Sequence, residues 1–556
     1  MDRRLDELCQ RYWDTEMEWN PVGATLLGDH RFDDRLPDLT ITAAEAQRRD
    51  LLLLHDEVTD VVTESIDDDL TKAMLLHELH TDSEMIDIDL VVAPCDPMIG
   101  PHSTLLRAAA LTSVTEPAQA EMLLTRYAGV PELLAQAADR HRHQLATGKT
   151  PVEVNVRRVL NQLGQYLSSP VDSDPFTGAT LPSDWDGAEG WRSRVGELVE
   201  DVIRPGFARY REMIADEILP ATRSAERPGL THLEGGDDAY RRLAAVFTSL
   251  PTPPEEIHRI GTEIATDHLP DEYAEVGKRA IDETNLDSIL RRLRDDPALR
   301  FTTAAEIVEA AEEVIARAIE EAPRWFGVLP EAGCAVMPVP ETLAADMPPA
   351  YYYPPATDGS RPGTYFINTH EPGTRARFEA ESVAFHEAVP GHHFQVALAA
   401  EMGDLPKFRR HALVIPFAEG WGLYAERLAD EMGLYSTDLD RLGMLSADSW
   451  RAGRLVVDTG IHALGWTRQR AVDFLTSWSA VAPSVIEVEV DRYIGVPGQA
   501  LAYKMGQLEI NRLRAYAEQR LGSRFDISGF HDTVLTSGSV TLGVLGDQVR
   551  RWVDSQ

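Results

Sequence analysis

Apolar residues recur at intervals of three and four along most of this chain, and this spacing constrains the fold more than any other feature. Such a period predicts amphipathic helices. It is clearest in Leu51–Ile86, Pro131–Leu145, Val195–Ile218 and Thr303–Ala322, where Glu and Arg fill the positions between. No fixed repeat of longer period is present, which argues against a solenoid. The sequence therefore predicts a mainly α-helical protein.

One part of the chain has a composition that does not favour helices. Residues 337–374 carry many prolines, and two short β-like runs lie in or beside this part, Ala335–Val339 and Gly363–Asn368. These runs predict a small β-sheet. An exposed strand of such a sheet offers backbone donors and acceptors to an extended peptide. We expect residues 1–334 to form a helical scaffold and 335–556 to carry the chemistry, within one continuous fold.

Charge and composition exclude several classes of function. The chain of 556 residues has 53 Lys and Arg against 91 Asp and Glu, a formal net charge of −38. This charge disfavours nucleic acid or an anionic membrane surface as partner, since both would be repelled. The three cysteines, Cys9, Cys95 and Cys334, are too far apart for a cysteine-rich metal site. The charged first residues and the lack of a long apolar run predict a cytoplasmic protein without membrane partners.

The segment Phe385–Gln395, with the sequence FHEAVPGHHFQ, carries the strongest chemical signal. Zinc hydrolases commonly use H-E-x-x-H on a helix, where residues i and i+4 present both imidazoles on one face and the Glu acts as base. Here the residue four positions after His386 is Pro390, and the next histidines are His392 and His393. The segment is therefore a lengthened version of that pattern.

Helix geometry indicates which histidines can share an ion. In a regular helix His392 would lie about 240° around the axis from His386, and His393 roughly 10.5 Å further along the same face. Pro390 removes a backbone donor and clashes with the preceding turn, and Gly391 adds conformational freedom. We therefore predict a helix interrupted at residues 389–391, with His386 and His392 as ligands and His393 as the alternate.

A third protein ligand would leave one coordination position open for water. Glu419 is the best candidate, at the start of the helical run Ile415–Glu426, with Glu426 as the alternate. If Glu419 is the ligand, Glu426 lies two turns further on and is placed to bond to a ligand histidine. Two His and one Glu favour a single Zn²⁺ ion.

The chain resembles the DUF885 family of proteins, which is grouped with the gluzincin metallopeptidases. The matching blocks are Gly359–Gly363, His386–Gln395, Glu419–Glu426, Asp458–Trp466, Pro497–Gly506 and Phe530–Leu542. Within the wider clan it is similar to the M32 carboxypeptidases. The resemblance implies a helical body split by a deep groove with zinc at its floor, and a possible homodimer. In these families a glycine precedes the second ligand histidine, which favours His392 because Gly391 precedes it.

The remaining candidates have catalytic roles. Glu387, next to His386, is placed to act as general base. Tyr503 resembles the tyrosine of an M32 block and is a candidate donor to the developing oxyanion, as is His462, which Asp458 could orient. A lone Tyr or His on an apolar helix is more often a satisfied core residue, and this alternative stays open for both.

A carboxypeptidase also needs a cation for the terminal carboxylate of its substrate, a task that suits arginine. Arg451, Arg454 and Arg492 lie in the right part of the chain, with Lys504 beside Tyr503. In so arginine-rich a chain, such a residue is more often part of a surface or structural ion pair. The sequence predicts a zinc-dependent metallopeptidase that hydrolyses small peptides, carboxypeptidase- or dipeptidase-like. The alternatives are a metal-dependent amidohydrolase on a non-peptide substrate and an inactive, peptidase-like binding protein.

Overall fold

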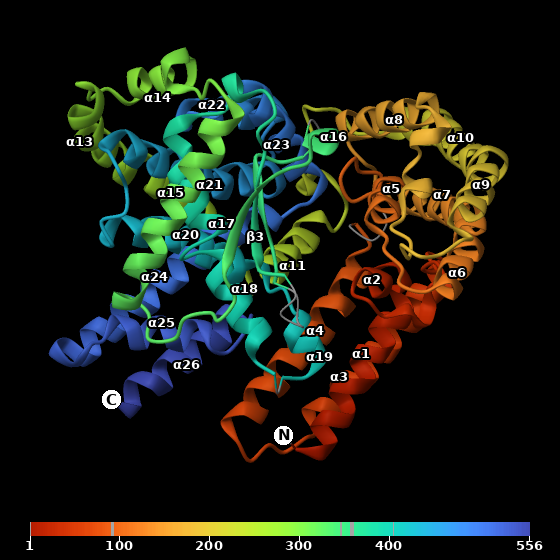
Figure 1. Ribbon diagram of the computed structural model, residues 1–556, viewed down its shortest axis with the longest axis horizontal. Coiled ribbons are helices and arrows are strands. Elements are labelled where there is room, and N and C mark those ends of the chain that lie inside the picture. The colour runs from red at the N-terminus through yellow and green to blue at the C-terminus, as the bar shows by residue number, and fades with distance from the viewer. Residues whose placement is uncertain (1, 91–93, 345–346, 356–360, 404) are drawn as a thin grey trace. The chain divides into compact units, whose positions relative to one another are not determined.

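The computed structural model describes residues 2–90, 94–344, 347–355, 361–403 and 405–556 (Figure 1). Contacts divide the chain into two compact units, Met1–Ala239 with Ile494–Val496, and Tyr240–Tyr493 with Pro497–Gln556. This division lies earlier in the chain than the boundary expected after residue 334. Every candidate site residue belongs to the second unit. Gly359 and Ser360, from one of the blocks quoted above, lie outside the described residues.

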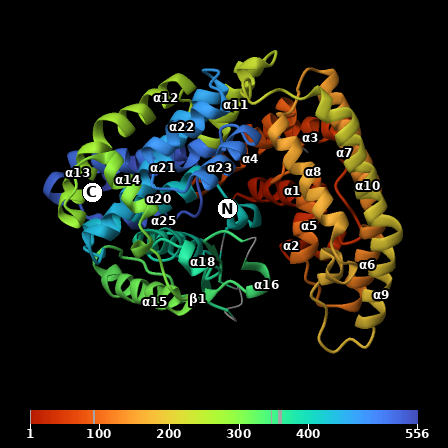
Figure 2. The ribbon, with the colours of Figure 1, turned by 90° about the horizontal axis from the view of Figure 1, so that it is seen from above.

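The regular elements in the described part of the first unit are helices, joined by loops and two isolated β-bridges. Its helices are α1 Arg3–Trp19, α2 Pro21–Leu26, α3 Ile41–Thr59, α4 Ile66–Ile88, α5 Pro101–Leu111, α6 Pro117–Ala128, α7 Val130–Ala146, α8 Glu153–Ser168, α9 Ala188–Leu198 and α10 Arg204–Met213, with α11 Gly236–Thr248 at the boundary. Helix α10 packs beside α7 and α8 (Figure 2). Buried side chains between them include Val159, Leu163 and Phe207. Phe207 lies in the stretch Val195–Ile218, whose apolar spacing predicted a helix, whereas α8 was not predicted.

One stretch that the apolar spacing predicted to be helical is not a continuous helix. The periodic stretch Leu51–Ile86 forms two helices, because α3 ends at Thr59 and α4 begins at Ile66. The Ser65 side chain accepts a hydrogen bond from the amide of Asp68, and acidic residues follow in the first turn of α4. A serine cap followed by acids is a strong start signal, which the apolar spacing alone did not reveal.

The second unit holds most of the remaining elements. They are α12 Pro254–Glu263, α13 Leu269–Ile281, α14 Leu286–Asp295, α15 Ala304–Glu321, β1 Cys334–Pro338, α16 Glu341–Ala344, β2 Ala350–Tyr353, β3 Gly363–Ile367, α17 Ala380–Glu387, α18 His392–Glu401, α19 Lys407–His411, α20 Ile415–Glu431, α21 Asp438–His462, α22 Arg468–Trp478, α23 Pro483–Gly495, α24 Ala502–Leu521, α25 Ile527–Leu535 and α26 Leu542–Ser555. Short 3-10 and π turns join several of these helices.

Helices α20 and α24 cross at close range in this unit. A Cβ atom on Gly420 would lie 2.5 Å from the Cα of Gly506 on the facing helix. Glycine at both positions therefore lets the two backbones approach each other. This contact fixes the helix that carries Glu419, one residue before the crossing.

The small sheet has three strands in the order β1-β3-β2. β1 pairs parallel to β3, with Cys334 opposite Gly363, and β2 pairs antiparallel to β3, with Ala350 opposite Ile367. The two predicted runs correspond to β1 and β3, whereas β2 was not predicted. β3 lies against α18 and β2 against α17, so the sheet adjoins the predicted zinc helix (Figure 1). The mainly helical fold class with a small sheet is confirmed.

None of the described helices combines the length and the apolar character that crossing a lipid bilayer would need. The groove implied by the family resemblance stays a prediction.

Candidate metal centre

The lengthened histidine segment forms two helices with a sharp break between them. α17 ends at Glu387 and α18 begins at His392, while Ala388 and Gly391 at the break have non-helical dihedrals. The rings of His386 and His392 are thereby brought together, with centroids 4.8 Å apart and planes at 85°. The predicted interruption is thus present, and it makes neighbours of two residues that a regular helix would separate.

Two features fix the chain at this break. A Cβ atom on Gly391 would lie 1.9 Å from the carbonyl oxygen of His386, so only glycine fits there. The indole Nε1–H of Trp421, on α20, donates to the carbonyls of Pro390 (2.9 Å) and Gly391 (3.2 Å). Trp421 is fully buried. Its hydrogen bonds therefore connect the break directly to the helix that carries Glu419.

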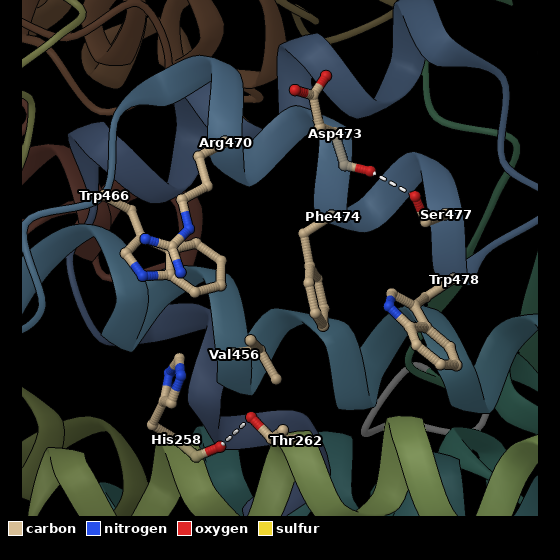
Figure 3. A pocket seen from close by; sticks show the side chains of 9 residues that line it. All are labelled: His258, Thr262, Val456, Trp466, Arg470, Asp473, Phe474, Ser477 and Trp478. Carbon is tan, nitrogen blue, oxygen red and sulfur yellow. Dashed lines mark hydrogen bonds between the residues drawn. The ribbon is translucent and has the colours of Figure 1, made fainter.

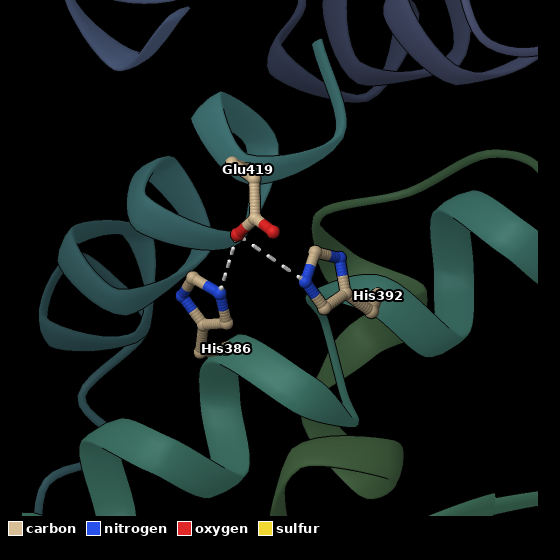
Figure 4. Close-up of side chains that lie close together, drawn as sticks. All are labelled: His386, His392 and Glu419. Carbon is tan, nitrogen blue, oxygen red and sulfur yellow. Dashed lines mark ion pairs between the residues drawn. The ribbon is translucent and has the colours of Figure 1, made fainter. Parts of the chain in front are cut away.

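Glu419 meets the two histidines from the facing helix. Its Oε2 lies 3.4 Å from Nε2 of His386 and 3.8 Å from Nε2 of His392 (Figure 4). The three donor atoms all lie within 4.8 Å of one another. Neighbouring ligands of a tetrahedral zinc ion are about 3.4 Å apart, given zinc–ligand bonds of about 2.1 Å. The donor types and their spacing both fit one such ion.

Glu426 lies behind His386, on the side away from Glu419. The Nδ1–H of His386 donates to Oε1 of Glu426 (2.8 Å), and the Ser382 hydroxyl donates to Oε2 (2.7 Å). This hydrogen bond fixes the ring so that Nε2 faces Glu419. Gly422 makes room for the ring, because a Cβ atom there would lie 2.6 Å from its Cε1. Glu426 thus orients His386 in the way expected of a partner behind a ligand.

The electrostatics of His386 also fit a cation at this place. Burial lowers the pKa of its imidazole, but hydrogen bonds to Glu419 and Glu426 outweigh burial and raise it to about 10. The two carboxylates around this imidazole therefore favour a positive charge between them. A metal ion bound here would supply that charge in place of the proton on Nε2.

His393, the alternate ligand, is turned toward the sheet. Its Nδ1 hydrogen bonds with the hydroxyl of Tyr352 on β2 (2.9 Å). Burial lowers the pKa of His393 to about 4, although a backbone hydrogen bond to Ala332 opposes that shift. The neutral ring therefore connects α18 to the sheet. Of the two adjacent histidines, His392 is the one beside Glu419.

Glu387, the candidate base, ends α17 next to His386. No hydrogen bond or ion pair ties its half-buried carboxylate to another residue within the described ranges. Tyr365 of β3 lies near this carboxylate. Burial, and then the charge of Glu387, raise the pKa of Tyr365 above its usual value. The Tyr365 hydroxyl is buried without a hydrogen-bond partner in the described chain. Tyr365 was not predicted from the sequence, since only the pairing of β3 within the sheet brings it near Glu387.

Tyr503 and Arg454 also lie near Glu419. Burial and the charge of Glu419 raise the pKa of the Tyr503 hydroxyl, whereas the charge of Arg454 lowers it. The Arg454 guanidinium carbon is 4.5 Å from the centroid of the Tyr503 ring. Tyr503 is therefore close to both a candidate ligand and a buried cation.

His462 and Asp458 make other contacts. Nε2 of His462 lies 2.9 Å from the carbonyl oxygen of Tyr493, and its ring packs on Tyr240. Asp458 accepts hydrogen bonds from the Tyr240 hydroxyl (2.6 Å) and the amide of Gly498 (3.0 Å). These contacts favour the core role left open for His462.

Lys504 is buried in an ion-pair network. Its ammonium pairs with Asp448 and donates to the side-chain oxygen of Gln507 (2.7 Å). Asp448 also accepts a hydrogen bond from Nε of Arg427 (3.0 Å). The charge of Lys504 is thus balanced within the fold, which favours a structural role over binding of substrate.

We expect Lys504→Met to lower the free energy of unfolding by roughly 3 kcal/mol, since removing one member of a buried pair leaves a charge uncompensated. Urea denaturation measures this loss. Lys278→Met, which removes an exposed lysine paired with Asp282, is the matched control and should change stability by less than about 1 kcal/mol. Unchanged stability of Lys504→Met together with weaker substrate binding would contradict the structural role.

A separate hollow of about 490 Å³ lies between α12, α21 and α22 (Figure 3). It is lined by His258, Thr262, Val456, Trp466, Arg470, Asp473, Phe474, Ser477 and Trp478. The guanidinium of Arg470 lies over the ring of Trp466, 4.0 Å from its centroid. None of the candidate metal residues belongs to this lining.

The chain is similar to a protein family and to solved structures, of which two are described below. Residues 21–549 match the family described as "Bacterial protein of unknown function (DUF885)". A putative lipoprotein from Colwellia psychrerythraea shares 24% identity at a TM-score of 0.91, with 100% of this chain and 99% of that chain covered. A putative lipoprotein of unknown function from Shewanella oneidensis shares 16% identity at a TM-score of 0.74, covering 98% and 99%. No curated protein matches the chain. The likeness to gluzincins and M32 carboxypeptidases stays a prediction.

The structural neighbours correct one expectation. Both neighbours are described as putative lipoproteins. This description contradicts the cytoplasmic location that we expected for the chain. The expectation rested on charge and on apolar runs. Neither property is specific to a cellular compartment, because a folded body needs the same surface chemistry on either side of a membrane.

Proposed function

The chain belongs to DUF885, a family of bacterial proteins of unknown function, and from its site we propose that it is a zinc-dependent peptidase. The observation that carries this proposal is the convergence of His386, His392 and Glu419. Next to them in the chain is Glu387, whose carboxylate makes no hydrogen bond or ion pair with another described residue. A purely structural zinc site is normally closed by four protein ligands. Three ligands next to a free carboxylate instead favour a hydrolytic site.

The residues have distinct tasks in this proposal. His386, His392 and Glu419 would hold the ion, which when bound acidifies water and polarises a carbonyl group. Glu387 accepts a proton from the attacking water as its oxygen adds to the peptide carbonyl carbon. The protonated Glu387 then gives this proton to the leaving nitrogen as the C–N bond breaks. Glu426 keeps the His386 ring oriented throughout.

Two tyrosines are placed to donate to the oxygen that gains negative charge. Tyr503 is close to Glu419, and the buried hydroxyl of Tyr365 lies near Glu387. A phenol that stays protonated remains a donor over the working pH range, and burial raises the pKa of both. We infer that Tyr503 and Tyr365 both stabilise this oxygen.

A peptide library read by mass spectrometry tests the activity. We expect protein purified without chelator to cleave short peptides, to stop after dialysis against a chelator, and to recover when zinc is returned. If zinc-loaded protein cleaves no peptide but hydrolyses other amides, the proposed substrate, a peptide bond, is wrong. Cleavage that continues undiminished after complete removal of metal would contradict the metal-dependent mechanism.

We expect Glu426→Gln to weaken zinc binding by about 10- to 100-fold, the usual effect of removing a carboxylate behind a ligand histidine. The amide is a poorer acceptor for the Nδ1–H of His386 and leaves the ring less firmly oriented. Competition with a chromogenic chelator measures the change in Kd. Glu431→Gln, at the exposed end of the same helix, is the control and should bind zinc like the wild type.

A further inference from the structure

The hollow between α12, α21 and α22 has aromatic side chains along one wall (Figure 3). Phe474 and Trp478 lie one turn apart on α22, with ring centroids 6.1 Å apart. Trp466 lies just before this helix, and its ring centroid is 5.8 Å from that of Phe474. Phe474 and Trp478 are half-buried. Half-buried aromatic rings that line a hollow offer a surface on which the ring of a ligand can stack.

Trp466 is held firmly at one end of this wall. It is buried, and a Cβ atom on Gly460 of α21 would lie 2.6 Å from its indole, so the ring rests directly on the backbone of that helix. The amide of Trp466 donates to the carbonyl of Gly460 (2.8 Å). His258 of α12 meets the indole edge-on, with ring centroids 5.5 Å apart. This end of the wall is therefore preformed, which lowers the entropic cost of binding a ligand.

Arg470 brings a positive charge to the hollow. Its guanidinium lies over the indole of Trp466, 4.0 Å from the ring centroid (Figure 3). Within the described residues no acceptor takes a hydrogen bond from this guanidinium, and no carboxylate lies within ion-pair distance of it. A guanidinium on an aromatic face keeps its N–H groups available at its edge, where a carboxylate accepts two of them at once. Arg470 is thus positioned by Trp466 to receive an anion.

The other titratable side chains that line the hollow leave this charge uncompensated. Asp473 accepts a hydrogen bond from the Gln469 amide (2.8 Å), and Figure 3 shows its carboxylate turned away from the aromatic rings. Burial lowers the pKa of His258 and the charge of Arg470 lowers it further, against a hydrogen bond to the backbone of Val456. The imidazole is therefore neutral at pH 7. The hollow accordingly combines aromatic rings with a positive charge.

We propose that this hollow binds a small aromatic carboxylic acid, whose ring stacks on Phe474 and Trp478 while its carboxylate accepts hydrogen bonds from Arg470. The volume of about 490 Å³ is in the range of small-molecule sites. The net charge of −38 opposes an anion at long range, but salt screens that field, whereas Arg470 acts at contact. The site shares no residue with the metal centre, and the inference does not rest on the proposed peptidase function.

The test compares three probes of similar shape on the full-length chain. 3-Phenylpropionate has the ring and the charge, 3-phenylpropionamide lacks the charge, and 3-cyclohexylpropionate lacks the aromatic ring. A saturation-transfer NMR titration measures weak binding of such small compounds. We expect 3-phenylpropionate to bind about tenfold more tightly than the amide and about fivefold more tightly than the saturated acid. Equal affinity for the acid and its amide, equal affinity for the two acids, or no binding of 3-phenylpropionate would each overturn the proposal.

Variants then assign the binding to the hollow. Arg470→Gln, at an exposed position, should lower the affinity for 3-phenylpropionate to that for the amide and leave the amide unchanged. Trp478→Leu should weaken both phenyl compounds by about fivefold and change the saturated acid less. Arg259→Gln is the matched control, because this exposed arginine of α12 pairs with Glu256 and Glu263 outside the hollow. Equal losses in Arg470→Gln and Arg259→Gln would indicate a general effect of charge and overturn the assignment.

A carboxylate can also bind zinc, so the metal centre must be separated from the hollow. The His392→Ala variant, which is expected to lack zinc, makes this separation. We expect it to bind 3-phenylpropionate as tightly as the wild type does. Loss of binding in His392→Ala together with unchanged binding in Arg470→Gln would place the acid at the metal centre and overturn the proposal. Because no step of this test needs zinc or turnover, a failure of the proposed peptidase function is told apart from a failure of this site.

Discussion

Replacing Glu387 with glutamine is expected to lower kcat by about 1,000-fold while leaving the zinc content unchanged. Positioned general bases contribute about 10²- to 10⁴-fold, and glutamine keeps the size of the side chain but cannot accept the proton. Glu387 makes no hydrogen bond or ion pair within the described chain, so the substitution should leave folding and metal binding intact. Steady-state kinetics and elemental analysis of the same preparation measure both quantities.

Glu320→Gln, an exposed position on α15, is the matched control and should keep wild-type activity and zinc. Full activity of Glu387→Gln with zinc bound would show that another group is the base. Loss of zinc from Glu387→Gln would instead place Glu387 among the ligands. Either result would contradict the role assigned to it here.

Replacing His392 with alanine is expected to abolish zinc binding at micromolar metal and with it the activity. Losing one of three protein ligands should cost more than the roughly 10- to 100-fold effect of losing an outer partner. Replacing His393 should leave zinc in place, because its Nδ1 bonds to Tyr352 and not to the centre. Elemental analysis and a chelator competition on both variants measure the difference.

This pair of neighbouring histidines is its own control, since both are buried or half-buried at the start of α18. We expect His393→Ala to lower the melting temperature by loosening α18 from the sheet, with zinc retained. Zinc lost only from His393→Ala would reverse the ligand assignment. Zinc lost equally from both would mean that the break between α17 and α18 does not survive either change.

Much of the centre follows from local sequence. Pro390 and Gly391 cannot continue a helix, so an interruption between the two candidate histidines was predictable from residue type and position. Glu426 lies two helical turns after Glu419, which is enough to place it behind a ligand. Periodicity likewise predicted α7 and α15, whose apolar faces are local features.

Other features depend on residues far apart in the chain and could not be predicted. The contact of Trp421 with the carbonyls of residues 390 and 391 exists only once α20 faces the break. β2 was missed because Tyr351–Tyr353 precedes prolines and suggests packing as readily as a strand. Whether an arginine or lysine is free depends on its partners, so Lys504 and Arg454 looked equivalent in sequence. Their environments differ, since Lys504 is paired with Asp448 and Arg454 has an unpaired Nη1.

Metal content tests the central claim most directly. Protein purified without chelator and analysed by inductively coupled plasma mass spectrometry is expected to contain close to one zinc ion per chain, or to take up one after dialysis against zinc. The expected ligands are His386, His392 and Glu419, so the His392→Ala variant measured beside it should contain none. No metal above background in the wild type, before and after loading, would contradict a metal centre and with it the proposed hydrolysis.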